Sequence, residues 1–445
     1  MKPCRFLLLF ALCTAGVSAQ SITYNGFDFS SGQPVSTLRD MSPSGANDRA
    51  IDTILTEPGF PAWSRDGSTL ALSSPDPLRP NKISRDIYLM DAATTLVRKI
   101  HTFEDFADAQ GFHTLLPVAK AFSPDGRRLA ATVFLQTGVV NSGTSTLPLL
   151  YLFDTSGLEP PVVLAPASLQ DEVTLGGMGC DWSSTNQIAW PGSCGTPYFY
   201  NGTLSTTTNG TCIYILQPNV NAPQARQLTF PTVRADGNAF VMQQKAQVDY
   251  APAFSPNGNF VAYVRATRTK EIPLNFPPDQ CSIRVVNING TGDTEILRLN
   301  PGFWISQMSW SPDGNQLVFD MGPQQIINGQ PVALPVANAV EIHSLNMNTL
   351  TPSPLHAAPA AWPAWRPGVT TPPVALPKLD LRLVPGSNDI ELTWPVGTAP
   401  FQLQSSPDLN GTWGNVNTAP VTTGGINKVT LSRNAPRMFF RLKGQ

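Results

Sequence analysis

A carboxylate, two bases and several tyrosines are the residues of this sequence best suited to contact a ligand. Asp249 and Lys120 each stand just before a segment that reads as a strand, and Arg265 opens a short charged run. Aromatic rings with a polar tip stack on sugars and peptides. The tyrosines placed for such contacts are Tyr198, Tyr200 and Tyr250. The combination favours binding of a protein, a peptide or a glycan.

Catalytic and metal motifs are missing from the sequence. It contains no Gly-x-Ser-x-Gly elbow, no His-Glu-x-x-His and no phosphate-binding loop. The densest group of potential metal ligands has a spacing that fits no metal motif and favours a solvated loop: His101, Glu104, Asp105, Asp108 and His113. We therefore expect no metal, no cofactor and a non-enzymatic binding protein. The alternative is a lyase or hydrolase that acts on polysaccharide or peptide through carboxylates such as Asp105 and Asp249.

A short sequence motif, here called the phrase, must position these residues and occurs six times. It is an aromatic residue, here called the phrase aromatic, followed by Ser-Pro-Asp-Gly or a variant of it. The aromatic positions recur every 55 to 72 residues, at Trp63, Phe122, Trp182, Phe254, Trp310 and Trp365. Proline presets φ, aspartate bonds to the local backbone, and glycine accepts the positive φ that closes a hairpin. Alternating β-branched and aromatic segments follow each copy. A repeat of this period with four short strands per unit is typical of a β-propeller.

These phrases resemble the TolB-type six-bladed β-propeller over residues 22–370. The third copy departs from that pattern, because Ser184-Thr185-Asn186 replaces the turn glycine, and Arg65 replaces proline in the first copy. The resemblance implies a structural motif without a catalytic residue, and a further possible role as a part of cell-envelope assembly.

Ring closure and the loop lengths complete the prediction for the propeller. The sixth copy supplies one strand only, so residues 22–24, 35–38 and 51–55 should complete its blade, which leaves no open sheet edge. The short Asp-Gly turns should share one face. The long connections should share the other, at residues 73–85, 101–118, 135–148, 165–178, 191–211, 230–250, 265–280 and 321–338. A scaffold that carries long loops on one face and short turns on the other binds its ligand with the long loops. We therefore expect the ligand on the loop-rich face.

Composition and the chain ends indicate export. Residues 1–19 read as a secretory signal with a small-residue cleavage site before Gln20, which predicts a secreted, periplasmic or cell-surface protein without a transmembrane segment. With a net charge of −2 and only 13% charged residues, the sequence gives no electrostatic basis for binding nucleic acid. We expect the propeller at residues 20–370, a proline-rich linker at 371–379, and a small β-sandwich-like domain at 380–445. The last segment resembles C-terminal modules attached to many exported bacterial proteins.

Four cysteines remain after the signal: Cys180, Cys194, Cys212 and Cys281. They allow three pairings. Cys194 and Cys212 fall on neighbouring strands of one hairpin, so a disulfide between them is the favoured prediction, with four free thiols as the alternative.

Overall fold

The computed structural model describes two compact units, of which one spans Ala19–Gly368 and the other includes Val369–Gln445. The described residues are 20–30, 35–108, 111–139, 143–164, 179–200, 203–218, 225–231, 247–267, 280–327, 330–335, 337–368, 379–384, 386–396, 401–407, 414–423, 426–433 and 438–444. No helix in these ranges is long and apolar enough to span a bilayer. The predicted signal and most of the predicted linker fall outside them, so the domain boundaries stay predictions.

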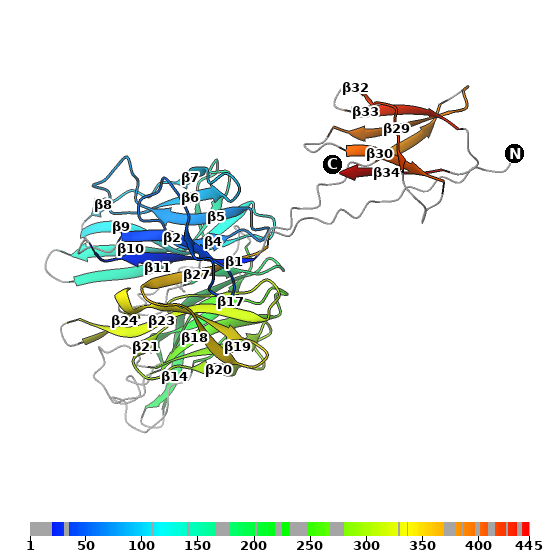
Figure 1. The fold of residues 1–445 in the computed structure, drawn as a ribbon. Helices are drawn as coiled ribbons and strands as arrows, with labels where there is room; N and C mark the ends of the chain where they lie inside the picture. Colours follow the sequence, from blue (N-terminus) through cyan, green and yellow to red (C-terminus); the bar gives the residue numbers. More distant parts are fainter. Residues whose placement is uncertain are drawn as a thin grey trace. The chain divides into compact units, whose positions relative to one another are not determined.

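Antiparallel meanders build the first unit (Figure 1). The first sheet runs in chain order through β4 (Gly59–Trp63), β5 (Thr69–Ser74), β6 (Asp86–Asp91) and β7 (Val97–His101). The second contains β8 (Phe106–Asp108), β9 (Gly111–Phe122), β10 (Arg128–Val139), β11 (Gly143–Asp154) and β12 (Val162–Val163). In both sheets the strand that ends on the phrase aromatic, β4 or β9, pairs with the strand after the Asp-Gly turn.

Two further meanders share one sheet. The first holds β13 (Asp181–Trp182), β14 (Ile188–Tyr200), β15 (Thr203–Leu216) and β16 (Ala225–Gln227). The second holds β17 (Val248–Phe254), β18 (Phe260–Thr267), β19 (Gln280–Asn287) and β20 (Thr294–Arg298). A single parallel residue pair, Thr211 with Val248, joins them. When each of these two meanders is counted as one blade, the count agrees with the six blades that the sequence predicts.

The next sheet and the chain ends close the ring. The sheet contains β21 (Phe303–Trp304), β22 (Met308–Trp310), β23 (Gln316–Ile327), β24 (Gln330–Pro335), β25 (Glu341–Asn346) and β26 (Thr351–His356). After it, β27 (Ala360–Arg366) pairs with β1 (Ser21–Asp28), which continues into β2 (Val35–Met41) and β3 (Arg49–Ala50). The shared terminal blade is confirmed. The chain is a β-propeller.

One strand of that shared blade is misplaced in the sequence analysis. Its fourth strand is Arg49–Ala50, and residues 51–55 lie beyond it. Only the first of these continues the pairing, since the Ile51 N–H donates to the Leu38 carbonyl at 2.8 Å. Leu55 is buried against Leu38 and Leu70 without belonging to a strand.

Apolar side chains fill the spaces between neighbouring blades. One cluster joins Ala62 and Leu89 of the first sheet to Phe122 and Leu129 of the second. The same arrangement recurs at the next junction, where Leu152 packs with Trp190. Each blade therefore buries both faces against its neighbours, which is why strands of this propeller contain continuous apolar runs.

The repeated turn keeps a left-handed residue in its ordinary and its variant form, although the third copy closes one residue earlier, from the Ser183 N–H to the Gln187 carbonyl. In the first copy Ser64 Oγ donates to Asp66 at 2.6 Å, and Gly67 has a φ of 68°. In the third copy Asn186 takes the left-handed position with a φ of 61° and accepts a hydrogen bond from Trp182 Nε1 at 3.0 Å. Asparagine tolerates this region better than other non-glycine residues, so the hairpin forms without the glycine.

Most of the described long connections are extended hairpins rather than loops, which corrects the prediction. The segments predicted as loops at 135–148, 191–211 and 321–338 are largely continuations of β10–β11, β14–β15 and β23–β24. Continuing the ladder satisfies backbone N–H and C=O groups that a long loop would leave to solvent. Residues 165–178 and most of 230–250 and 265–280 fall outside the described residues.

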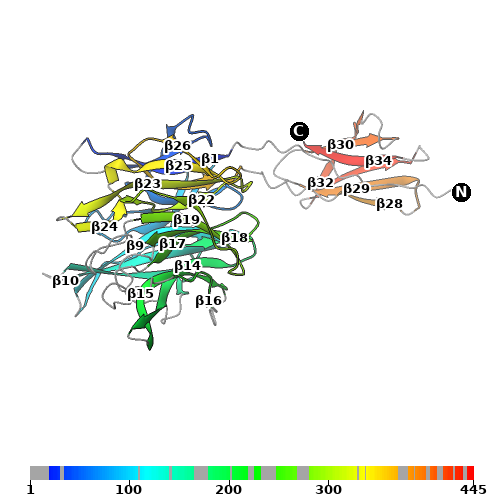
Figure 2. The same ribbon diagram turned by 90° about the horizontal axis from the view of Figure 1, so that it is seen from below.

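The second unit is a small β-sandwich (Figure 2). One sheet has the order β28 (Asp380–Leu383), β29 (Asp389–Pro395), β33 (Ile426–Ser432), β32 (Val421–Thr423). The other has the order β31 (Gly414–Asn415), β30 (Phe401–Ser406), β34 (Phe439–Gly444). Leu392 and Trp394 of the first sheet pack with Leu403 and Phe440 of the second, and this shared core holds the two sheets together.

Candidate functional site

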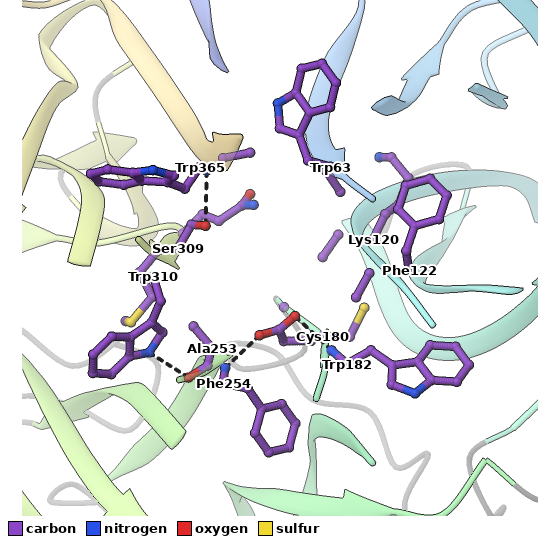
Figure 3. Close-up of a pocket in the computed structure, with 18 of the residues that line it drawn as sticks. Trp63, Lys120, Phe122, Cys180, Trp182, Ala253, Phe254, Ser309, Trp310 and Trp365 are labelled. Carbon is purple, nitrogen blue, oxygen red and sulfur yellow. Dashed lines mark hydrogen bonds between the residues drawn. The ribbon is translucent and has the colours of Figure 1, made fainter. Parts of the chain in front are cut away.

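The six phrase segments surround a central cavity of about 380 Å³ (Figure 3). Its wall begins one to three residues before each phrase aromatic, as at Pro61, and ends in the turns. Arg65, Pro256, Pro312 and Pro367 lie at that end, and all four are exposed or half-buried. The cavity thus occupies the part of the channel next to the Asp-Gly turns and reaches the surface there. The predicted ligand site lies on the opposite, loop-rich face.

Small residues directly before the aromatics keep the cavity open. Four of these six positions are alanine, at Ala62, Ala121, Ala253 and Ala364. With so little side chain in front of it, one edge of each innermost strand faces the cavity, and such an edge offers to a ligand the N–H and C=O groups that side chains have not already bound. The repeated phrase therefore supplies both the turn and the wall of the channel.

The other two positions carry polar groups that link neighbouring innermost strands. Asp181 accepts the backbone N–H of Phe254 at 2.6 Å, and Ser309 accepts the backbone N–H of Trp365 at 3.1 Å. Burial raises the pKa of Asp181 to about 6, although backbone N–H groups and the nearby Arg65 favour its charged form. Both side chains line the cavity and are engaged in holding blades together.

The phrase aromatics pack against the preceding blade. Trp63 Nε1 donates to Thr23 Oγ1 at 2.9 Å, and Trp310 Nε1 donates to the Ala253 carbonyl at 3.0 Å. The guanidinium of Arg366 lies 4.5 Å from the Trp63 ring centroid, a cation–π distance. These rings tie blades together, which fits a structural role of the repeated phrase.

Arg65, which replaces proline in the first copy of the phrase, lies at the rim of the cavity. It is exposed, and its Nη2 donates to the Trp182 carbonyl at 3.5 Å. This contact reaches from the first copy of the phrase to the third, so a cationic side chain lies across the mouth of the cavity. The signal was available in the sequence: a charged residue stands where four other copies have proline.

Among the predicted ligand residues whose side chains the structure describes, Lys120 is the one that lines the cavity. It lies in β9, is 5% exposed, and Figure 3 places it beside Phe122. Its Nζ donates to Ser73 Oγ at 3.2 Å and lies 5.6 Å from the Phe60 ring centroid. Burial lowers the pKa of Lys120 to about 7, and the cation Arg85 acts in the same direction.

Asp249, Arg265 and Tyr250, which were predicted as ligand contacts, make contacts inside the fold, and their role in binding stays a prediction. Asp249 is fully buried and accepts two hydrogen bonds from Arg265, at 2.6 and 2.7 Å. Burial raises the pKa of Asp249 despite this partner. Tyr250 is also fully buried, donates its hydroxyl to the Ile305 carbonyl at 2.7 Å and stacks on Trp304 at 5.3 Å. The sequence pattern placed these residues near a channel mouth but could not show that their partners lie inside the fold.

Tyr198 and Tyr200 lie near the tip of the β14–β15 hairpin, opposite Ser205 and Thr203. Their side chains fall outside the described residues, so their role in binding stays a prediction. The same holds for the side chain of Cys194. Its backbone pairs with Gly210, whereas Cys212 pairs with Gly192, so the two cysteines are diagonal neighbours on one face of the hairpin. A bond between them stays a prediction.

The acidic and histidine residues around 101–113 serve local structure. Asp105 accepts the backbone N–H groups of Ile83 and Ser84 at 2.8 and 2.7 Å. Glu104 pairs with Arg79, and Asp108 lies 2.7 Å from His113. Within the described ranges no group of three or more His, Cys, Asp or Glu could hold a metal ion.

Comparison with known proteins gives fold similarity only. The chain matches no protein-family profile and no curated protein sequence. Similar solved structures include TolB from Acinetobacter baumannii, with 17% identity, a TM-score of 0.49, and coverage of 79% of this chain and 68% of that one. Another is the β-propeller domain of the Trilobed protease from Pyrococcus furiosus, with 11% identity, a TM-score of 0.38, and coverage of 90% and 96%. An oligogalacturonate lyase in complex with manganese has 11% identity, a TM-score of 0.37, and coverage of 85% and 95%. Such values carry no argument about ligand or activity, and the propeller assignment rests on the strand pairing.

Proposed function

We propose that this protein is an exported binding protein that holds an extended segment of a protein, peptide or glycan in its central cavity. The segment enters on the side of the Asp-Gly turns and passes Arg65. The observation that carries the proposal is the cavity itself, whose wall is made of innermost strand edges from all six phrase segments.

The chemistry of the wall supports an uncharged, hydrogen-bonding polymer rather than an ion. Strand edges present both donors and acceptors, which suits amide groups and hydroxyls. The alanines leave the edges accessible, and the phrase aromatics beside them add apolar contact area. Arg65 would contact a carbonyl or hydroxyl oxygen at the mouth, since it has only the long Trp182 contact there.

The direct test is a peptide and glycan array probed with the mature protein and with matched arginine variants. Arg65→Ala should weaken binding about tenfold, the order of one charge-assisted hydrogen bond. Arg127→Ala is the control, because Arg127 is an exposed arginine in the equivalent turn of the second copy and does not line the cavity.

A second variant separates the two faces. Replacing residues 325–334 by a short turn removes the tip of the β23–β24 hairpin on the loop-rich face and should leave binding unchanged. Loss of binding in this variant, with Arg65→Ala unaffected, would place the site on the loop-rich face. Turnover of an array component would instead support the lyase or hydrolase alternative.

A further inference from the structure

Lys120 occupies a position that the fold does not require to be lysine. The residue two before the phrase aromatic is Pro61, Lys120, Cys180, Pro252, Met308 or Pro363 in the six copies. All the others are uncharged, and the position is buried in the second copy. A lysine here needs an explanation other than packing, because a buried ammonium ion is costly unless it is paired.

The surroundings of the amine do not supply a counter-ion. Among the described residues its one hydrogen-bond partner is the neutral Ser73 Oγ, and its other close neighbour is the face of Phe60. Of the titratable groups that affect it, the Cys180 thiol acts to raise the pKa of Lys120 and the cation Arg85 acts to lower it. Burial raises the pKa of that thiol to about 12, so it is uncharged at neutral pH. Desolvation and a neighbouring cation are the two ways in which proteins turn a lysine into a nucleophile.

We propose that Lys120 is a reactive amine that captures small aldehydes and ketones entering the central cavity, as an imine. In this step the Nζ lone pair forms a bond to the carbonyl carbon, and a proton passes from nitrogen to the carbonyl oxygen. The resulting carbinolamine loses one water and leaves a C=N bond, so no oxidant or reductant takes part. The inference uses the cavity and the lysine only and is independent of the proposed polymer ligand.

The lowered pKa of Lys120, about 7, supports the reaction at neutral pH. About half of such amines are uncharged at pH 7, against roughly one in 2,500 for an ordinary lysine with a pKa near 10.4. The cavity reaches the surface at the Arg65 end and has Lys120 in its wall, which gives a small carbonyl compound a route to this residue.

Labelling of the full-length folded protein tests the inference. The probe is glycolaldehyde with sodium cyanoborohydride, which reduces the imine to a stable secondary amine that peptide mapping locates. The internal control is Lys428, whose side chain is 48% exposed. At pH 7 Lys120 should be labelled at least about tenfold faster than Lys428, because about half of the Lys120 amines are uncharged there. The labelling rate of Lys120 should level off above pH 8.

Two results would overturn the inference: labelling of Lys120 no faster than that of Lys428, or labelling of Lys120 only after unfolding. This comparison is made within one wild-type molecule and needs no variant to fold. Lys120→Met should abolish the fast phase and leave Lys428 labelling unchanged, and a fast phase that persists would assign the reaction to another residue. Polymer binding, measured on the array, succeeds or fails separately.

Discussion

Ile22 lies directly opposite Trp365 in the antiparallel ladder between β1 and β27, so the first and last strands of the propeller belong to one blade. Ile22 is fully buried and packs in one cluster with Trp365, Tyr24 and Val318. Closing a ring between distant chain segments makes its stability depend on contacts that form only when the whole propeller has folded.

Ile22→Ala should therefore lower the free energy of unfolding of the entire propeller by about 2–5 kcal/mol, the range for truncating a buried isoleucine. Urea denaturation of the full chain, followed by tryptophan fluorescence, measures this. Ile54→Ala is the control, because Ile54 is 78% exposed and should change stability by less than about 0.5 kcal/mol. Deleting residues 20–56 should abolish the cooperative transition, and a truncated protein that unfolds at the parent midpoint would disprove closure by a shared blade.

Gly126 tests the backbone requirement of the repeated turn. It has a φ of 70°, and a Cβ added there would meet nothing within 4 Å, so any cost of substitution comes from conformation alone. Gly126→Ala should destabilise the protein by about 1 kcal/mol. Gly126→Asn should cost less, because Asn186 already takes this conformation in the third copy. Equal losses for the two variants in thermal denaturation would show that the turn does not depend on left-handed φ.

The repeat made the propeller and its closure predictable, because turn chemistry and strand alternation are local properties that the sequence carries. The extended hairpins were mistaken for loops, since Thr- and Gly-containing segments such as residues 203–210 also suit irregular structure. Sequence alone could not assign Asp249 and Tyr250 to the core, because burial depends on partners such as Arg265 and Ile305 from other strands.

The residues of the cavity were also only partly predictable from the sequence. Lys120 was identified as a ligand residue from its position before the phrase aromatic, and the structure places it in the cavity wall. Arg65 and Asp181 were missed because each departs from the repeat at a position that is usually structural. Departures from a repeat consensus are therefore the sequence signal to examine in such a propeller.

Lys120 should make stability depend on pH. Burial lowers the pKa of Lys120 to about 7 in the folded state, against about 10.4 in the unfolded chain. Between these values the unfolded chain holds more protons, so stability rises with pH by as much as about 1.4 kcal/mol per unit from this group. Lys120→Met should stabilise the protein at pH 7 and flatten this rise. Urea denaturation of both proteins at pH 7, 8 and 9 provides the measurement, and parallel curves would show that the amine is solvated in the folded state.

Asp181 should make the stability of the protein depend on pH in the opposite direction. Burial raises the pKa of Asp181 to about 6, above the value of about 3.9 for an aspartate in an unfolded chain. The folded protein therefore holds more protons between pH 4 and 6, and the stability contributed by this group falls as pH rises through that window.

Asp181→Asn keeps an oxygen that can accept the Phe254 N–H and removes the charge, so it should be as stable as the parent or more stable at pH 7. Asp181→Leu leaves that N–H without an acceptor and should cost about 1–3 kcal/mol. Comparing both variants with the parent by thermal denaturation at pH 4.5 and 7 separates the charge from the hydrogen bond. If Asp181→Asn and Asp181→Leu are equally destabilised at pH 7, the carboxylate charge itself holds the blades together and the assignment of a raised pKa is wrong.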